Sequence, residues 1–192
     1  MIPVDYFRDQ VSLETPGLRL EPLGPQHFEG SWAALHDEES RRMTGTHETF
    51  TEEQIREWLA SRADAHDRAD WAIVRKEDGS YVGEVVLNDL DPHNLSMGFR
   101  IALSSAGVFG KGYGSEATKA VVDYGLEVVG LHRISLEVVG LHRISLEVVD
   151  FNTRAQRVYT KAGFHPEGIL RDAWYWDGEW SDVIVMAKLA AG

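Results

Sequence analysis

The sequence contains no cysteine among its 192 residues. This absence excludes a disulfide framework, a cysteine nucleophile and a metal site built from thiolates. The chain also lacks an apolar run near the length of a membrane span, and residues 1–10 show no basic-then-apolar signal pattern. We therefore expect a cytoplasmic protein with no membrane partner.

Basic residues are scarce as well. Lys and Arg number 19 against 31 Asp and Glu, which gives a formal net charge of −12. Such a charge repels nucleic-acid phosphates and attracts cations, so we expect no nucleic-acid partner and a field that helps collect a positively charged substrate. An anionic ligand would need a local site made of backbone amides. The eight histidines show no paired spacing, and no metal site is predicted.

What is present fits one domain. The length and the 43% share of hydrophobic residues are typical of a single globular domain, 1–192, with its core over about 15–189. Strands are predicted over 18–23, on both sides of Asp78-Gly79, over 94–103 and 144–150, and on both sides of Asp177-Gly178; helices are predicted over 25–41, from Thr51, over 115–129 and over 153–162. This order predicts an α/β (α+β) fold, in which helices flank a mixed, mostly antiparallel sheet.

Residues 126–149 contain a tandem repeat of ten residues, LEVVGLHRIS. Fourteen consecutive positions, from 126 matching 136 to 139 matching 149, are identical. One extra copy of ten residues cannot stack a core, so a solenoid is excluded. We interpret the repeat as a slipped duplication with a surplus at about 131–143, and expect a surface excursion or a helix extension there. The alternative is that the spare strand pairs with another subunit in a homodimer.

A glycine-rich loop, V-F-G-K-G-Y-G-S-E-A, lies between the strand expected at 94–103 and the helix expected at 115–129. Its glycines can take positive φ, and the first-turn amides of the helix can bind an anion. The pattern is therefore either a phosphate cradle or a simple turn. In the helix that follows, Ala117, Val121, Tyr124 and Val128 are expected to form one apolar stripe.

A second segment, D-F-N-T-R-A-Q-R-V-Y-T-K-A-G-F, follows the glycine-rich loop some forty residues later and helps to interpret it. Together the segments resemble the GCN5-related N-acetyltransferase (GNAT) superfamily, whose loop motif falls on 109–114. The second motif of the superfamily falls on Asn152, Ala155, Tyr159, Gly163 and Phe164. The stretches 18–23 and 167–187 resemble its RimJ/RimL branch, which acetylates ribosomal-protein N-termini. The resemblance spans roughly 15–189.

The resemblance implies acetyl-CoA as co-substrate, with its pyrophosphate at the loop and its pantetheine arm along strand 94–103. The implied cofactor-binding residues are Phe99, Ile101, Phe109, Gly110, Lys111, Gly112, Tyr113, Gly114, Ser115, Asn152 and Tyr159. Two positions depart from the family pattern. Phe109 stands where Gln or Arg is usual, and Ala155 replaces a frequent Ser, which removes one polar contact to the cofactor.

Acetyl transfer from a thioester to an amine needs a neutral amine, a stabilised carbonyl oxygen and a proton for the departing thiolate. The resemblance implies that Tyr159 donates this proton, and a phenol with a pKa of about 10 is protonated at neutral pH. Packing of Tyr159 on the sheet is the alternative. Asn152 either fixes the cofactor arm or serves only as a helix cap.

Two carboxylates are candidates for the base. Glu84 lies on an expected central strand, where a carboxylate is uncommon without a reason. The resemblance implies that such an acid reaches the acceptor amine through water; an exposed position on an edge or on an open face of the sheet is the alternative. Asp182 matches an acid that recurs near the acceptor in the RimJ/RimL branch.

The resemblance therefore implies an N-acetyltransferase in which a primary amine attacks the thioester of acetyl-CoA directly. The acceptor stays open between a protein N-terminus, a polyamine and an amino-bearing small molecule. The alternative function is a catalytically silent acyl-CoA-binding module that acts as a sensor or scaffold.

Overall fold

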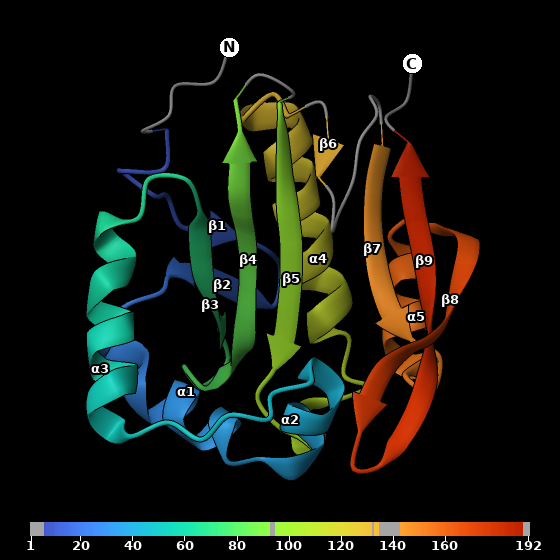
Figure 1. Cartoon of the computed structure of the whole chain (residues 1–192). Helices are drawn as coiled ribbons and strands as arrows, with labels where there is room; N and C mark the ends of the chain where they lie inside the picture. Colours follow the sequence, from blue (N-terminus) through green and yellow to red (C-terminus); the bar gives the residue numbers. More distant parts are fainter. Residues whose placement is uncertain (1–5, 93–94, 132, 135–142, 190–192) are drawn as a thin grey trace.

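The computed structural model describes residues 6–92, 95–131, 133–134 and 143–189. Its strands form a main sheet in the order β1-β2-β3-β4-β5-β6 and a C-terminal sheet in the order β7-β9-β8 (Figure 1). The strands are β1 (Leu13–Glu14), β2 (Leu18–Pro22), β3 (Ala69–Arg75), β4 (Tyr81–Asp91), β5 (Ser96–Leu103), β6 (Arg133–Ile134), β7 (Arg143–Val149), β8 (His165–Trp176) and β9 (Glu179–Leu189). Neighbouring strands are antiparallel except for the β5–β6 pair, which is parallel.

Helices cover both faces of the main sheet. The helices are α1 (Phe28–Leu35), α2 (Glu38–Thr44), α3 (Glu52–Ser61), α4 (Tyr113–Asp123) and α5 (Thr153–Lys161), and the short turns are η1 (Pro25–His27), η2 (Arg62–Asp64), η3 (Ala106–Val108) and η4 (Tyr124–Val128). In Figure 1, α4 lies behind β4 and β5, α5 lies behind the C-terminal sheet, and α1, α2 and α3 lie on the remaining side of the main sheet. The mixed, mostly antiparallel fold flanked by helices is therefore confirmed. In the part of the chain described, no helix has the length and apolar character needed to cross a bilayer.

The strand β3 is buried on both faces because helices pack on both. Its alternate residues Trp71 and Ile73 belong to a large core cluster that also includes Ala117 of α4. Ala72 and Val74 point the other way, into a smaller cluster with α1 and α3. The main sheet is thus a middle layer packed on both faces, from which β4 and β5 present side chains.

Local sequence signals account for most boundaries. Thr51 caps α3 in a capping box with Gln54, as its position before an acidic first turn predicts. The helix expected over 25–41 is divided, because the Asp37 side chain accepts a hydrogen bond from the Ser40 N–H at 2.8 Å and starts α2. The sequence pattern of apolar residues did not reveal this internal cap.

The stripe expected along the helix after the glycine loop is wrong at its last position. Ala117 and Val121 are buried, but Val128 is 64% exposed. The reason is that α4 continues as a π-helical turn, in which the Val129 N–H donates to the Tyr124 carbonyl at 3.0 Å. The wider turn moves Val129 into the buried position that Val128 would take in an α-helix.

The repeat is used in two places. Arg133 and Ile134 of the first copy form β6 and pair with Ser96 and Met97 of β5, whereas the second copy forms β7 against β9. Leu131 and Ile134 are buried, so the surface excursion or helix extension expected over 131–143 is wrong for residues 131, 133 and 134. Residues 132 and 135–142 of that segment lie outside the described residues.

Candidate active site between the two sheets

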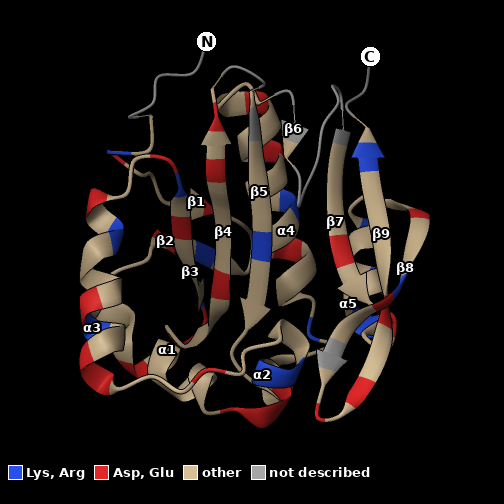
Figure 2. Ribbon diagram, viewed as in Figure 1, with Lys and Arg blue, Asp and Glu red and all other residues tan. Residues whose placement is uncertain are grey.

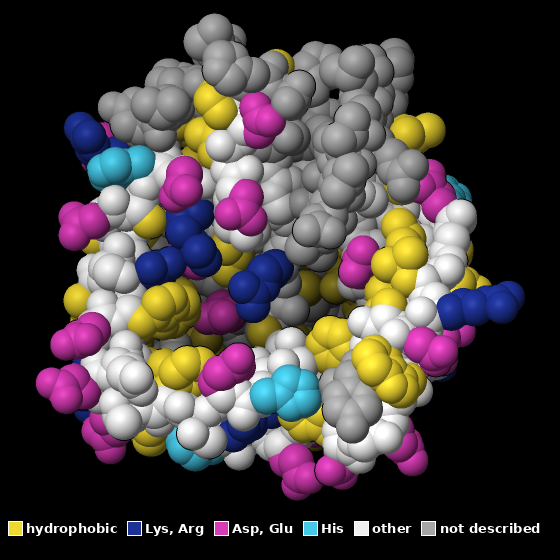
Figure 3. Space-filling view, in the orientation of Figure 1, with side chains coloured by type: hydrophobic (Ala, Val, Ile, Leu, Met, Phe, Trp, Pro, Cys, Tyr) yellow, Lys and Arg dark blue, Asp and Glu magenta, His cyan; other side chains and the backbone are white. Residues whose placement is uncertain are grey.

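A cavity of about 830 Å³ lies between the main sheet and the C-terminal sheet. Its walls come from β4 and β5, from β7, from the start of α4, from α5, and from α2 and α3. Figure 3 shows this face hollowed, with hydrophobic side chains inside the hollow and charged side chains of both signs around it. Phe99 and Ile101 line the cavity from one face of β5, and Arg100 and Ala102 line it from the other.

The glycine loop forms one end of the cavity. Gly110 and Gly112 have φ of +74° and +89°, values that favour glycine, and Gly112 directly precedes α4. A Cβ at either position would meet no heavy atom within 4 Å, so both glycines border open space. The first-turn residues of α4 line the cavity, where their backbone N–H groups have no partner within the helix. This end is built to receive an anionic group.

Nearly all residues implied as cofactor-binding meet here. The residues that line the cavity are Phe99, Ile101, Phe109, Gly110, Gly112, Tyr113, Gly114, Ser115, Asn152 and Tyr159. Lys111 is the exception: its side chain is exposed and does not line the cavity.

Three basic residues of α5, Arg154, Arg157 and Lys161, also line the cavity and were missed by the sequence reasoning. Their spacing of three and four residues places them on one side of the helix, and that spacing is the signal that could have found them. The Arg154 guanidinium lies 5.4 Å from the ring centre of Phe109, which places it at the loop end. An acidic protein therefore has a local basic wall here.

Tyr159 and Asn152 place the second motif in the cavity wall. The Tyr159 ring packs edge-on against Phe164 with centroids 6.0 Å apart, and burial raises the pKa of its phenol to about 12. The Asn152 side chain accepts a hydrogen bond from the Ala155 N–H at 3.1 Å. Asn152 is therefore a helix cap that also faces the cavity.

The opposite end of the cavity is formed by the middle of the main sheet and contains Glu84. This residue lies opposite Ala72 on β3 and Ala102 on β5, so it sits on an interior strand rather than at an edge. Burial raises the pKa of the Glu84 carboxyl, and the charge of Asp70 raises it further, while nearby arginines oppose the shift. Asp89, Arg100 and Trp58 line the same end, and none of the three was predicted.

Asp182 does not line the cavity. Its carboxylate accepts a hydrogen bond from the Asp172 N–H at 3.0 Å, where the β8–β9 register shifts between Leu170 and Trp174. Asp172 has a φ of +48°. The contact holds this irregular part of the hairpin, so the structure places Asp182 in a supporting position in β9.

The mouth of the cavity is bounded by a contact between α2 and the C-terminal hairpin. Gly45, at the end of α2, lies against the indole of Trp174, which also lines the cavity. Beside it, the rings of His47 and Trp176 lie 4.4 Å apart. This contact joins segments that are about 130 residues apart in the sequence.

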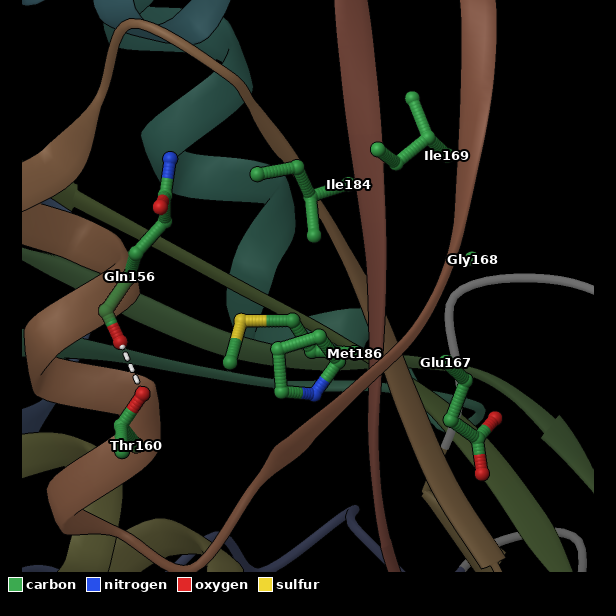
Figure 4. A pocket seen from close by; sticks show the side chains of 8 residues that line it. Gln156, Thr160, Glu167, Gly168, Ile169, Ile184 and Met186 are labelled. Atoms are coloured by element: carbon green, nitrogen blue, oxygen red, sulfur yellow. Dashed lines mark hydrogen bonds between the residues drawn. The ribbon is translucent and has the colours of Figure 1, made fainter.

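A second cavity of about 250 Å³ lies between α5 and the C-terminal sheet (Figure 4). Ile169, Ile184 and Met186 approach it from the strands, and Gln156 and Thr160 approach it from the helix. The polar groups are engaged locally, because the Thr160 hydroxyl donates to the Gln156 carbonyl and the Gln156 amide donates to the Asp150 carbonyl, both at 2.8 Å. The larger cavity is therefore the candidate site.

Comparisons with known proteins agree with this geometry. The sequence profile of a family described as "Acetyltransferase (GNAT) domain" matches residues 17–165. The chain is 30% identical over 128 residues to a probable N-acetyltransferase, YjcK, of Bacillus subtilis (strain 168), a match that covers 67% of this chain and 65% of YjcK. It is also 30% identical over 121 residues to the spermidine N(1)-acetyltransferase of Escherichia coli (strain K12), over 63% of this chain and 59% of that protein. These matches therefore span slightly less than two thirds of either relative.

Solved structures show the same fold. A spermidine N-acetyltransferase from Vibrio cholerae, in complex with CoA and spermine, superposes with a TM-score of 0.75 at 19% identity, over 90% of this chain and 95% of the other. A structure described as a ribosomal-protein-serine acetyltransferase from Vibrio cholerae has a TM-score of 0.71 at 16% identity, over 94% and 98%. At these identities the likeness concerns the fold.

Proposed function

The chain belongs to the GNAT acetyltransferase family, and from this premise we propose that it is an acetyl-CoA-dependent N-acetyltransferase acting on a primary amine. The observation that carries the proposal is that the glycine loop, Tyr159 and Glu84 all line one cavity. A cofactor-binding module without catalysis needs the loop, but it has no need of a half-buried carboxylate at the far end.

The residues present at the loop end fit acetyl-CoA. Its phosphates require hydrogen-bond donors and positive charge, which the first turn of α4 and the three basic residues of α5 provide. Bound acetyl-CoA would supply the acetyl thioester. Phe99 and Ile101 offer an apolar wall between the loop and Glu84, and this wall suits the uncharged arm of the molecule.

Two protein groups would handle the protons of the reaction. The Glu84 carboxylate accepts a proton from the acceptor amine, directly or through a water, and its raised pKa brings it closer to that of the amine. The Tyr159 phenol keeps its proton at neutral pH because burial raises its pKa to about 12, so it can donate to a sulfur leaving group.

The acceptor we propose is a small cationic amine. Glu84 and Asp89 line the acceptor end, and the formal charge of −12 attracts cations to the molecule as a whole. The similarity to a spermidine N(1)-acetyltransferase supports this class. A protein N-terminus, the acceptor expected for the RimJ/RimL branch, is the other class to be tested.

The test is release of free CoA thiol from acetyl-CoA in the presence of spermidine, a simple monoamine, or a peptide with a free N-terminus. We expect release with spermidine. Glu84→Gln should lower the amine-dependent rate about 100-fold, the scale of general-base catalysis. Glu57→Gln, on the exposed side of α3, is the matched control and should leave the rate unchanged.

The pH dependence of kcat/KM is an independent test of the role of Glu84. Glu84 must be ionised to accept a proton, so kcat/KM should fall as the pH drops through its pKa. Because that pKa is raised, the fall should begin above the usual glutamate range near 4.3. Glu84→Gln should lose this limb. Binding of acetyl-CoA without thiol release for any amine would instead identify a silent cofactor-binding module.

A further inference from the structure

Beside the acceptor end of the cavity lies a buried ion cluster centred on Asp70 of β3. Asp70 is 2% exposed. The Arg68 guanidinium binds its carboxylate with both prongs, Nε to Oδ2 at 2.7 Å and Nη2 to Oδ1 at 2.6 Å, and Arg62 Nη1 lies 3.9 Å from Oδ2. The Gln10 side chain holds the backbone of Asp70 through its N–H and its carbonyl. Asp70 is thus a fixed anion with two cationic partners.

The strand register places this cluster next to Glu84. Asp70 lies opposite Val86 of β4, and Glu84 lies two residues before Val86, so Asp70 and Glu84 are diagonal neighbours on one face of the sheet. Arg100 of β5 lies opposite Val86 from the other side and is also diagonal to Glu84. Figure 2 shows the acidic residues of β4 beside the basic one of β5 in this part of the main sheet.

Glu84 therefore faces charges from three directions. Asp70 faces it from β3, Arg100 from β5, and Arg62 and Arg68 from the segment between α3 and β3. On β4 itself, desolvation raises the pKa of the Tyr81 phenol, and the charge of Glu84 raises it further. Asp67 and Asp89 raise the pKa of Arg68. In the described part of the chain, Arg62 and Arg68 bind Asp70 and neither forms an ion pair with Glu84.

We propose that Asp70 is a positioning residue that holds the guanidinium groups of Arg68 and Arg62 away from Glu84, so that the Glu84 carboxylate stays available to the acceptor amine. The inference rests on the proposed role of Glu84. Two of the three arginines that face Glu84, Arg62 and Arg68, would be free to pair with its carboxylate in the absence of a competing anion. Asp70 supplies that competing anion one strand away.

The direct test is the pKa of Glu84, followed by the carboxyl carbon shift in a glutamate-labelled protein, with Glu84→Gln to assign the signal. In Asp70→Asn the released guanidinium groups turn to Glu84 and the repulsion from Asp70 is lost. Both effects lower the pKa of Glu84, by about one unit or more. Asp123→Asn, which removes the acid of the Lys119–Asp123 pair on α4, is the matched control and should leave it unchanged. An unchanged Glu84 pKa in folded Asp70→Asn overturns the proposal.

Steady-state kinetics distinguish a positioning role of Asp70 from a general loss of structure. In Asp70→Asn we expect the KM for the amine to rise about tenfold, equivalent to the loss of about 1.4 kcal/mol, while the KM for acetyl-CoA stays constant. The acid limb of kcat/KM should move to lower pH with the pKa of Glu84. Asp70→Asn/Arg68→Gln removes the cation that binds Asp70 at 2.6–2.7 Å and leaves only Arg62, so it should restore most of the amine KM. A double variant no better than the single one contradicts the proposal.

Two further results keep the inference separate from the proposed function. If Glu84→Gln retains full turnover, the role of Glu84 fails, but the shift of its pKa in Asp70→Asn is still measurable. If Asp70→Asn does not fold, Arg68→Gln gives the opposite sign: Asp70 is then less neutralised and should raise the pKa of Glu84. A fall in that variant would overturn the proposed arrangement.

Discussion

Tyr159 and Tyr124 show which property of a side chain makes it a candidate acid. Burial raises the pKa of both phenols to about 12, so both keep their protons at neutral pH. Tyr159 lines the cavity, whereas Tyr124 packs edge-on against Trp71 in the core with ring centroids 5.8 Å apart. The pKa is therefore permissive, and the location of the phenol decides its role.

Tyr159→Phe is expected to lower kcat about 100-fold, because the proton for the leaving sulfur must then come from water. The affinity for acetyl-CoA should change little, since the ring and its contact with Phe164 remain. Steady-state kinetics and cofactor titration measure the two quantities. Tyr124→Phe, at a phenol whose pKa is also raised to about 12, should leave kcat intact; equal effects in the two variants would remove Tyr159 from the mechanism.

Most of the residues expected in the site from the sequence belong to two local motifs. Gly110, Gly112, Asn152 and Tyr159 follow from the motifs that carry the resemblance, and the structure brings them together along one cavity. Arg100 and Trp58 could not be found in this way, because they reach the cavity through strand register and helix packing. Asp182 illustrates the same limit, since two register shifts in the β8–β9 hairpin decide where its carboxylate points.

At the scale of elements, two segments with the same sequence adopt different secondary structures. LEVV at 126–129 completes the π-helical turn after α4, whereas LEVV at 146–149 is the second half of β7. The first stretch continues a helix that has already formed, and the second is paired residue by residue with β9. The sequence predicts both assignments only because of what flanks each copy.

Deletion of residues 131–140 tests whether one copy is sufficient. Because the copies are identical, the shortened chain again reads LHRISLEVVD after Gly130, so a single strand can pair with both β5 and β9. We expect acetyl transfer equal to that of the intact chain, and a midpoint of thermal unfolding that is not lowered, since a shorter connection costs less closure entropy.

Thiol release and thermal denaturation of the shortened chain are the measurements. A folded but inactive product would show that the second copy serves the site.

At the scale of the molecule, the contact of Gly45 and His47 with the C-terminal hairpin joins the two sides of the cavity mouth. A Cβ at Gly45 would lie 2.2 Å from Cη2 of Trp174, and Gly45 has a φ of +64°. Gly79 has a similar φ of +73°, but a Cβ there would meet nothing within 4 Å. An alanine substitution at Gly79 would therefore test backbone strain alone, whereas one at Gly45 would test backbone strain together with contact with the hairpin.

Gly79→Ala should lower the free energy of unfolding by about 1 kcal/mol, the cost of a left-handed alanine. Gly45→Ala should lower it by about 1–3 kcal/mol more, because Trp174 must move, and it should also raise the KM for the amine. Denaturant unfolding and steady-state kinetics are the measurements. Equal losses of stability in the two variants would mean that Trp174 moves at no cost in free energy and that this contact does not hold the mouth of the cavity.

The cavity reaches both faces of β5, with Phe99 and Ile101 on one and Arg100 and Ala102 on the other. A donor held along one face and an acceptor held at the other can be present together. The acetyl group then has no need of an intermediate carrier on the protein, and the chain has no cysteine thiol to serve as one. In kinetic terms, this geometry favours a ternary complex over a substituted-enzyme cycle.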